Sequence, residues 1–168
     1  TFIIGFKDEA DWDFEPNKKT SSSIFNSHLP LVKSKAKKKL KEMFDKGDID
    51  ERYYYKQDAY MYKDLKKAVV SKNTVYQWRR VYVRENKSGE CPTLTANMGT
   101  GGHNVPLIKD DLGIRKLTPR ECLNFQGFPK SFKFPNDMPI SQRYKQAGNA
   151  VTVNLIQKIA KIIKNSII

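Results

Sequence analysis

The side chains best suited to chemistry in this sequence are two adjacent arginines with a glutamine close by, Gln77, Arg79 and Arg80. An arginine fork can meet O6 and N7 of guanine together in the major groove, so these residues are candidates for reading DNA bases. They belong to a stretch expected to form a strand, in which successive residues face opposite ways. Only one of the two arginines is therefore expected to read bases. Alternatively, both hold phosphates or pair with Glu85 or Glu90.

Two glycine-containing segments could approach a ligand closely. Met98 to Asn104 carries three glycines, which let backbone amides come near phosphates. No Gly-Lys-Ser/Thr sequence follows, so the segment does not fit a Walker phosphate loop. Gly148-Asn149 is typical of a polar turn that leads into an apolar helix. Taken alone, it could be no more than a turn with an asparagine cap.

The usual nucleophiles and metal ligands are sparse. Cys91 and Cys122 are too few for a disulfide framework, which favours a reducing compartment. Neither has histidine or cysteine neighbours at zinc-ligand spacing, so no metal site is predicted. His28 and His103 have no carboxylate or nucleophile placed beside them, and surface positions are the simpler expectation.

The charge of the chain favours a polyanionic partner. Among 168 residues, 31 Lys and Arg outweigh 18 Asp and Glu, which leaves +13 at pH 7. Such a field attracts nucleic acid, although a lysine-rich surface that merely stays solvated is the alternative. No stretch approaches the ~20 apolar residues that span a bilayer, so a soluble protein without a membrane partner is expected.

The elements that position these residues follow from sequence patterns. Thr118-Pro119-Arg120-Glu121 is the clearest helix start, because the threonine can cap, the proline fits the first position and the glutamate completes a capping box. Leu117 and Cys122 sit where a hydrophobic staple would form, and Gly127 should end this helix. The other expected elements are a strand at 2–6, a loop at 7–31, a helix at 33–46, a short helix within 51–67, strands at 75–84, 93–95 and 105–108, a proline-rich connector at 129–141 and an amphipathic helix at 151–167.

Two longer stretches indicate a family by their order and spacing. The first runs from Arg115 to Pro129, and the second, Gln146 to Val151, begins 17 residues after the first ends. They resemble motifs IX and X of the DNA cytosine-5 methyltransferases, and the strand at 2–6 resembles the end of that family's motif VIII. The resemblance covers the whole chain as the C-terminal part of such an enzyme, of the bacterial restriction-modification type. The chain does not begin with Met, and we expect it to be a natural split subunit or a piece of a longer protein.

The resemblance implies an α/β fold in two parts. One is a small, mixed, β-rich target-recognition domain, and the other is the C-terminal strand and helix of a Rossmann-like methyltransferase domain that uses S-adenosylmethionine. We expect residues 1–20 to end the catalytic domain, 21–137 to form the target-recognition domain including motif IX, and 138–168 to carry motif X back to the catalytic domain. The structural residues of motif IX would be Arg115, Thr118, Pro119, Arg120 and Glu121.

The resemblance also implies binding residues. On the family pattern Arg80 is the favoured base reader, and Thr93 matches a threonine that supports phosphate and target-nucleotide contacts. Singly, Thr93 and Thr95 could be ordinary strand residues. The DNA-binding residues expected are Gln77, Arg79, Arg80, Thr93, Thr95, Gly99, Thr100, Gly101, Gly102 and His103. The residues expected to line the S-adenosylmethionine pocket are Gly148, Asn149, Ala150 and Val151.

The family's catalytic residues have no counterpart in this sequence. The chemistry requires a cytosine flipped out of the duplex, a thiolate from a Pro-Cys motif that attacks C6, and a glutamate that protonates N3. Cys91 precedes Pro92 instead of following a proline, and Cys122 lies inside the capped helix. A glycine-rich cofactor turn and a Glu-Asn-Val element are also lacking. We therefore predict no catalytic residue here and no activity from this chain alone.

The predicted function is DNA recognition and completion of the cofactor pocket in a DNA (cytosine-5-)-methyltransferase of the bacterial cytoplasm. Its partners would be double-stranded DNA and the N-terminal catalytic portion. Apolar surface on the strand at 2–6 and the helix at 151–167 would allow docking of that portion or self-association. The alternatives are a non-catalytic, sequence-specific DNA-binding module and an RNA-directed relative. The intact motif X argues against a pure binder.

Overall fold

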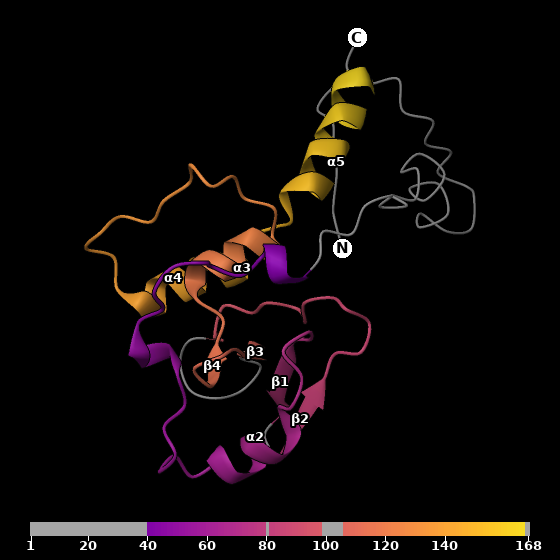
Figure 1. Ribbon diagram of the computed structural model, residues 1–168. Helices are drawn as coiled ribbons and strands as arrows, with labels where there is room; N and C mark the ends of the chain where they lie inside the picture. Colours follow the sequence, from indigo (N-terminus) through magenta and orange to yellow (C-terminus); the bar gives the residue numbers. More distant parts are fainter. Residues whose placement is uncertain (1–39, 80, 99–105, 167–168) are drawn as a thin grey trace. The chain divides into compact units, whose positions relative to one another are not determined.

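The computed structural model describes residues 40–79, 81–98 and 106–166 (Figure 1). The contacts divide the chain into two units, and Lys38–Thr152 forms the larger. The expected strand at 2–6, the loop at 7–31 and residues 33–39 of the first expected helix lie outside the described residues. The described elements of the larger unit are η1 (Leu40–Glu42), η2 (Glu51–Tyr53), α2 (Tyr62–Ala68), β1 (Tyr76–Arg79), β2 (Tyr82–Glu85), β3 (Pro106–Lys109), β4 (Ile114–Lys116), α3 (Pro119–Phe125) and α4 (Ile140–Asn149).

The described strands form one antiparallel sheet in the order β2-β1-β3-β4. The expected single strand at 75–84 is wrong, because Arg79 pairs with Tyr82 and the chain reverses between them. A connection of two residues leaves the apolar–polar alternation unbroken, so the pattern alone resembles one long strand. The short strand expected at 105–108 is confirmed as β3, while β4 is an additional strand of three residues.

The expected strand at 93–95 is also wrong. These residues pair with no strand of the described chain, and the Met98 amide instead donates to the Thr95 carbonyl at 3.1 Å, which closes a turn. Met98 itself is fully buried. The segment therefore packs as a folded loop, because it is held by its burial and its turn and not by a strand ladder.

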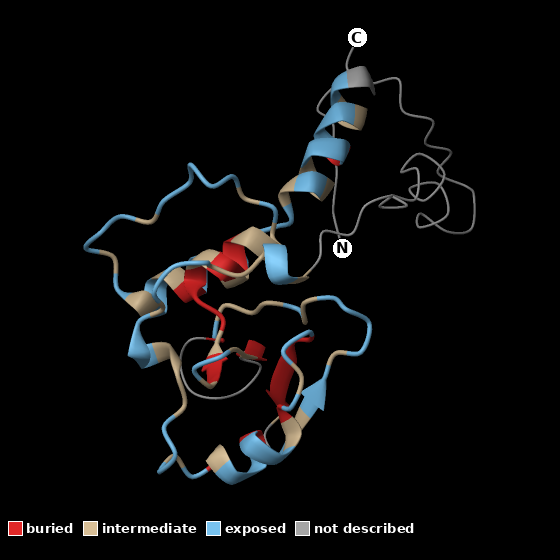
Figure 2. Ribbon diagram, viewed as in Figure 1, coloured by how far each residue is buried: buried red, intermediate tan, exposed pale blue. Residues whose placement is uncertain are grey.

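The sheet buries apolar side chains on both faces, and Figure 2 shows β1 in the colour of buried residues. On one face, Tyr76 and Trp78 of β1 pack in a cluster with Leu65 of α2. The cluster on the other face comprises Val75, Met98, Ile108, Leu117, Cys122, Leu123, Tyr144 and Ala147. The second cluster joins the sheet to α3 and α4, which are the helices that carry the two family-like stretches.

Helix α3 begins as expected. The Thr118 hydroxyl accepts from the Glu121 amide at 3.1 Å, and the Glu121 carboxylate accepts from the Thr118 amide at 2.7 Å, which confirms the capping box. Leu117 and Cys122 are both fully buried in the same cluster, as a hydrophobic staple requires. Gly127 follows the helix with φ +80°, the left-handed conformation that ends helices and favours glycine.

The expected turn at Gly148-Asn149 is wrong, because both residues belong to the last turn of α4. The sequence of α4 is mostly polar, and only Tyr144 and Ala147 are buried in it. The Tyr144 hydroxyl donates to the Leu117 carbonyl at 2.6 Å, which fixes α4 against the start of α3. Few apolar positions mark this helix in the sequence, so tertiary contacts decide its formation.

Helix α5, Val153–Ser166, is the described part of the smaller unit. It confirms the expected amphipathic helix, with a start two residues later than Val151. Ile159 is its buried residue among the side chains that are described, and Leu155, Ile156, Ile162 and Ile163 are half-buried. Within the described part of the chain, no helix is long and apolar enough to cross a membrane.

Candidate functional site

The β1–β2 hairpin presents the predicted arginine region at one end of the sheet. Arg79 is the last residue of β1 and is half-buried, whereas Arg80 lies outside the described residues. Gln77 is only 3% exposed, and its side chain has a partner, so it is less available to a base than Arg79. The other predicted DNA contacts in the loop, Gly99, Thr100, Gly101, Gly102 and His103, also lie outside the described residues.

The predicted DNA-contact segment and the predicted cofactor segment meet at Gly148. A Cβ atom built on Gly148 would lie 2.2 Å from both the carbonyl carbon and the carbonyl oxygen of Thr95, and 2.5 Å from the amide nitrogen of Ala96. No side chain fits at such distances, so glycine is required for α4 to pack against this loop. The Thr95 hydroxyl donates to the Asn97 side-chain oxygen at 2.7 Å, which holds the loop in its turn.

The predicted cofactor residues lie at the end of α4 and directly after it. Asn149 and Val151 are exposed, and they offer an amide and an apolar surface to a bound molecule. Ala150 has less to offer, because its amide already donates to Gln146 and its carbonyl accepts from Gln126 at 3.3 Å. Gln126 also accepts from the Thr152 hydroxyl at 2.9 Å. This glutamine therefore holds residues 150 and 152 beside the end of α3, a role that its position in the sequence after α3 does not reveal.

Arg115 is the centre of a buried ionic network. Its two terminal nitrogens each donate at 2.8 Å to a different oxygen of Glu121, and its Nε donates to Asp110 at 2.7 Å. The Arg115 and Glu121 side chains are 3% and 0% exposed. Burial alone would raise the pKa of Asp110, but the hydrogen bonds from Arg115 and Tyr54 bring this pKa below its ordinary value.

The same network reaches a distant part of the chain. The Asp45 amide donates to Glu121 at 3.0 Å, and the Thr118 hydroxyl donates to the Asp45 carboxylate at 2.8 Å. Glu121 thus caps α3, neutralises Arg115 and holds the segment around Asp45. The predicted structural residues Arg115, Thr118 and Glu121 are brought together, and the contact with Asp45 has no signal in the sequence.

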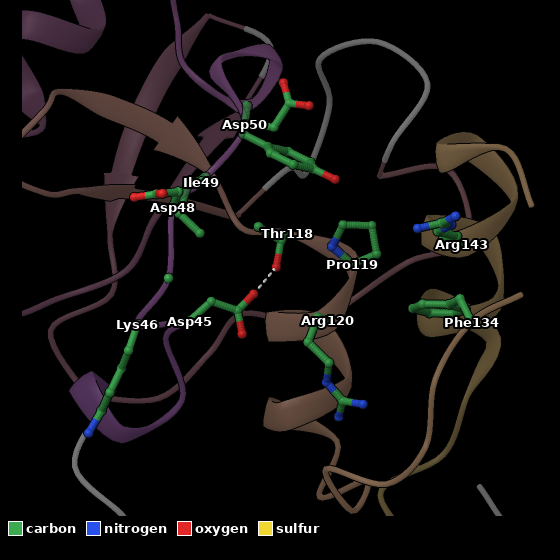
Figure 3. A pocket seen from close by; sticks show the side chains of 12 residues that line it. Asp45, Lys46, Asp48, Ile49, Asp50, Thr118, Pro119, Arg120, Phe134 and Arg143 are labelled. Carbon is green, nitrogen blue, oxygen red and sulfur yellow. Dashed lines mark hydrogen bonds between the residues drawn. The ribbon is translucent and has the colours of Figure 1, made fainter. Parts of the chain in front are cut away.

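A cavity of about 490 Å³ opens beside the start of α3 (Figure 3). It is lined by acidic residues of the 45–50 segment, by Thr118 and Pro119, and by two arginines, Arg120 and Arg143. The guanidinium of Arg120 donates to the carbonyls of Phe128 and Phe132, and that of Arg143 donates to the carbonyls of Pro135, Asn136 and Met138. Both arginines are thus engaged in holding the 128–138 connector, and the lining includes none of the predicted DNA or cofactor residues.

Neither cysteine is prepared to act as a nucleophile. Burial raises the pKa of the Cys91 thiol to about 12 and places that of Cys122 well above its ordinary value. A thiolate is the reactive form, so both sulfurs stay protonated and inert at neutral pH. Across residues 40–79, 81–98 and 106–166, no three His, Cys, Asp or Glu side chains gather in a way that could hold a metal ion.

The fold of the chain is similar to solved methyltransferase structures. It aligns with the S. pombe Dnmt2 methyltransferase at a TM-score of 0.57 and 13% identity, over 83% of this chain and 46% of that one. The Entamoeba histolytica methyltransferase EhMeth aligns at a TM-score of 0.55 and 13% identity, over 77% of this chain and 41% of that one. At this level of identity the likeness concerns the mixed α/β fold alone.

Sequence relatives carry more specific information. The type II methyltransferase M.Bsp6I of Bacillus sp. (strain RFL6) is 56% identical over 131 residues, which cover 77% of this chain and 41% of that protein. M.DsaV of Dactylococcopsis salina is 29% identical over 95% of this chain and 41% of that protein. The human tRNA (cytosine(38)-C(5))-methyltransferase is 40% identical over 31% of this chain and 13% of that protein.

The chain thus spans less than half the length of the relatives it matches. The model of the family described as "C-5 cytosine-specific DNA methylase" matches residues 1–165, nearly the whole sequence. The chain belongs to the C-5 cytosine-specific DNA methylase family.

Proposed function

We propose that this chain is the DNA-recognition and cofactor-pocket-completing portion of a DNA (cytosine-5-)-methyltransferase. The contact between Gly148 and the Thr95–Ala96 backbone carries the proposal. It joins the segment expected to contact DNA to the helix that ends in the expected cofactor residues. The exposed Asn149 and Val151 that follow this contact support the cofactor-pocket part of the proposal.

In the proposed reaction, a target cytosine leaves the duplex stack so that its C5 becomes accessible. S-adenosylmethionine supplies the methyl group when it is bound. The residues of this chain bind and orient: Arg80 reads bases, Thr93 supports the target nucleotide, and Asn149 with Val151 lines the cofactor. The half-buried Cys91 and the buried Cys122 serve no nucleophilic role, so the attacking thiolate belongs to the catalytic portion.

In the proposed enzyme, the chain contributes to two domains. Residues 1–20 end the catalytic domain, 21–137 form the target-recognition domain, and 138–168 return to the catalytic domain. The N-terminal catalytic portion, a neighbouring polypeptide or an earlier part of the same one, packs on the apolar side of α5. A second copy of this chain can occupy that side when the catalytic portion is missing.

The test combines this chain with the part of M.Bsp6I that lies outside the 131 residues that match it at 56% identity. The mixture is given radiolabelled S-adenosylmethionine and duplex DNA, and the methylated positions are sequenced. We expect C5-methylated cytosine in one sequence context, and only when both polypeptides are present. Activity on transfer RNA with none on DNA would instead support the RNA-directed alternative. The match to M.Bsp6I covers 77% of this chain at 56% identity, whereas the match to the human tRNA enzyme covers 31%. This difference favours DNA as the substrate.

Replacing Arg80 with alanine should relax sequence discrimination by about 1–3 kcal/mol, the contribution of one bidentate arginine–guanine contact. The measurement is the ratio of affinities for target and scrambled duplexes at one salt concentration. Arg52→Ala is the matched control, because Arg52 pairs with Asp50 away from the hairpin. An unchanged ratio in the Arg80 variant would remove this residue from base reading.

Replacing Asn149 with alanine should raise the KM for S-adenosylmethionine of the reconstituted enzyme by about threefold to tenfold, the effect of one lost side-chain hydrogen bond. The kcat and the affinity for DNA should change little, because Asn149 lies at the helix end and not in the DNA-contact loop. Asn136→Ala removes another exposed asparagine and serves as control. A loss in kcat alone would contradict a cofactor-binding role.

A further inference from the structure

The edge strand β2 carries a polar, exposed face. Tyr82 is 57% exposed and Arg84 is exposed, whereas Val83 between them packs against the cluster that contains Trp78. In the strand register, Tyr82 lies opposite Arg79, and Arg84 lies opposite Gln77. Opposed residues of an antiparallel pair point to the same face of the sheet. Arg79, Tyr82 and Arg84 therefore share the face away from α2, and we call them the edge-strand strip.

The strip has the composition of a phosphate-binding surface. Arg79 and Arg84 are diagonal neighbours, with Cα atoms about 7–8 Å apart by strand geometry, and Tyr82 lies opposite Arg79 and two residues from Arg84. Two guanidinium forks and a phenol hydroxyl are donors that match phosphate oxygens. Glu85 lies opposite Tyr76, so it points to the other face and does not neutralise the strip.

A charged edge strand also has a simpler role, since charge discourages edge-to-edge aggregation. That role requires only a charge on the edge. It does not account for a large tyrosine that is more than half exposed beside two arginines on a chain of net charge +13. An aromatic interleaved with arginines is typical of nucleic-acid surfaces.

We propose that Tyr82 and Arg84, together with Arg79, bind the phosphodiester backbone of duplex DNA and so position the hairpin for base reading. The proposal rests on the DNA-binding function proposed above and adds a division of labour to it. Contacts to phosphate set the register of the protein on the duplex and carry no sequence information. The strip therefore contributes to affinity for every duplex, and residues beyond it supply discrimination.

The test measures binding of the full chain to a random-sequence duplex by fluorescence anisotropy, at several salt concentrations. Arg84→Ala should weaken binding roughly tenfold, the loss of one charge-assisted contact, and lower the slope of log Kd against log salt by about 0.9. Tyr82→Ala should weaken binding without changing the slope. Arg84→Lys should keep the slope, because it keeps the charge, which also shows that the position tolerates substitution.

Lys66→Ala is the matched control, since Lys66 is an exposed cation on α2, the helix that covers the opposite face of the sheet. It should leave affinity and slope nearly unchanged. Equal effects of Arg84→Ala and Lys66→Ala would contradict phosphate binding by the edge-strand strip. They would not contradict DNA binding by the chain as a whole. If the Arg84→Ala variant aggregates but its log Kd keeps the same dependence on log salt, Arg84 protects the edge strand from aggregation and does not bind phosphate. If the unaltered chain binds no duplex, the DNA-binding function itself is wrong.

Discussion

Replacing Arg115 with alanine should lower the free energy of unfolding by about 3–5 kcal/mol, the cost of leaving one member of a buried ion pair without its partner. Glu121 is fully buried and would lose both guanidinium hydrogen bonds. Natural domains are stable by about 5–15 kcal/mol, so this loss removes a large share of the total. Urea unfolding, followed by the fluorescence of the buried Trp78, measures the change.

The control for Arg115 is an arginine in an exposed ion pair. Arg52 contacts Asp50 at 2.7 Å, but the two side chains are 59% and 44% exposed. Water already solvates both charges, so Arg52→Ala should have only a small effect. If the two variants unfold at the same urea concentration, the buried network does not stabilise the fold. Glu121→Gln offers a second check, because it keeps the size of the side chain and removes only the charge.

Replacing Gly148 with alanine should destabilise the larger unit by about 1–3 kcal/mol or more, although alanine is the better helix former by about 1 kcal/mol. The new methyl group would lie 2.2 Å from the Thr95 carbonyl, which is backbone and cannot rotate away. Either α4 or the Thr93–Met98 loop must move. A fall in melting temperature and faster amide exchange in the loop are the measurements.

Gly47→Ala is the control for this substitution, because an added Cβ at Gly47 meets no atom within 4 Å. It should leave the melting temperature close to that of the unaltered chain. An equally small effect of Gly148→Ala would show that α4 and the loop are not in tight contact. In the reconstituted enzyme, the Gly148 variant should lose both DNA and cofactor affinity, whereas Asn149→Ala affects the cofactor alone.

Features of the fold that depend on neighbouring residues could be predicted from the sequence, whereas features that depend on distant contacts could not. The start of α3 could be predicted because Thr118 and Glu121 satisfy each other across one turn. Helix α4 could not, because two buried side chains and a glycine facing a distant loop hold it. The β1–β2 reversal is missed for a different reason. Arg80 and Val81 are not the glycine or asparagine that usually mark a tight hairpin, so the turn leaves no sign.

Some residues of the candidate site could likewise be predicted from the sequence, and others could not. The importance of Arg115, Thr118 and Glu121 could be predicted as a motif, but the part played by Asp45 depends on a contact between residues 76 positions apart. Gln126 and the edge-strand strip acquire roles only when the register of β2 and the end of α4 are known. Thr93 and Thr95 were expected on a strand, yet they lie in a loop that α4 supports.

The carboxylate of Glu121 joins one contact between near neighbours in the sequence and one between distant segments. Its bond to Thr118 closes over three residues, so it can form as soon as the first turn of α3 forms. Its bond to the Asp45 amide closes over 76 residues, and ordering that much chain carries an entropic cost that only a nearly complete core can offset. A substitution at Glu121 would therefore slow the nucleation of the helix and also accelerate the release of the segment around Asp45.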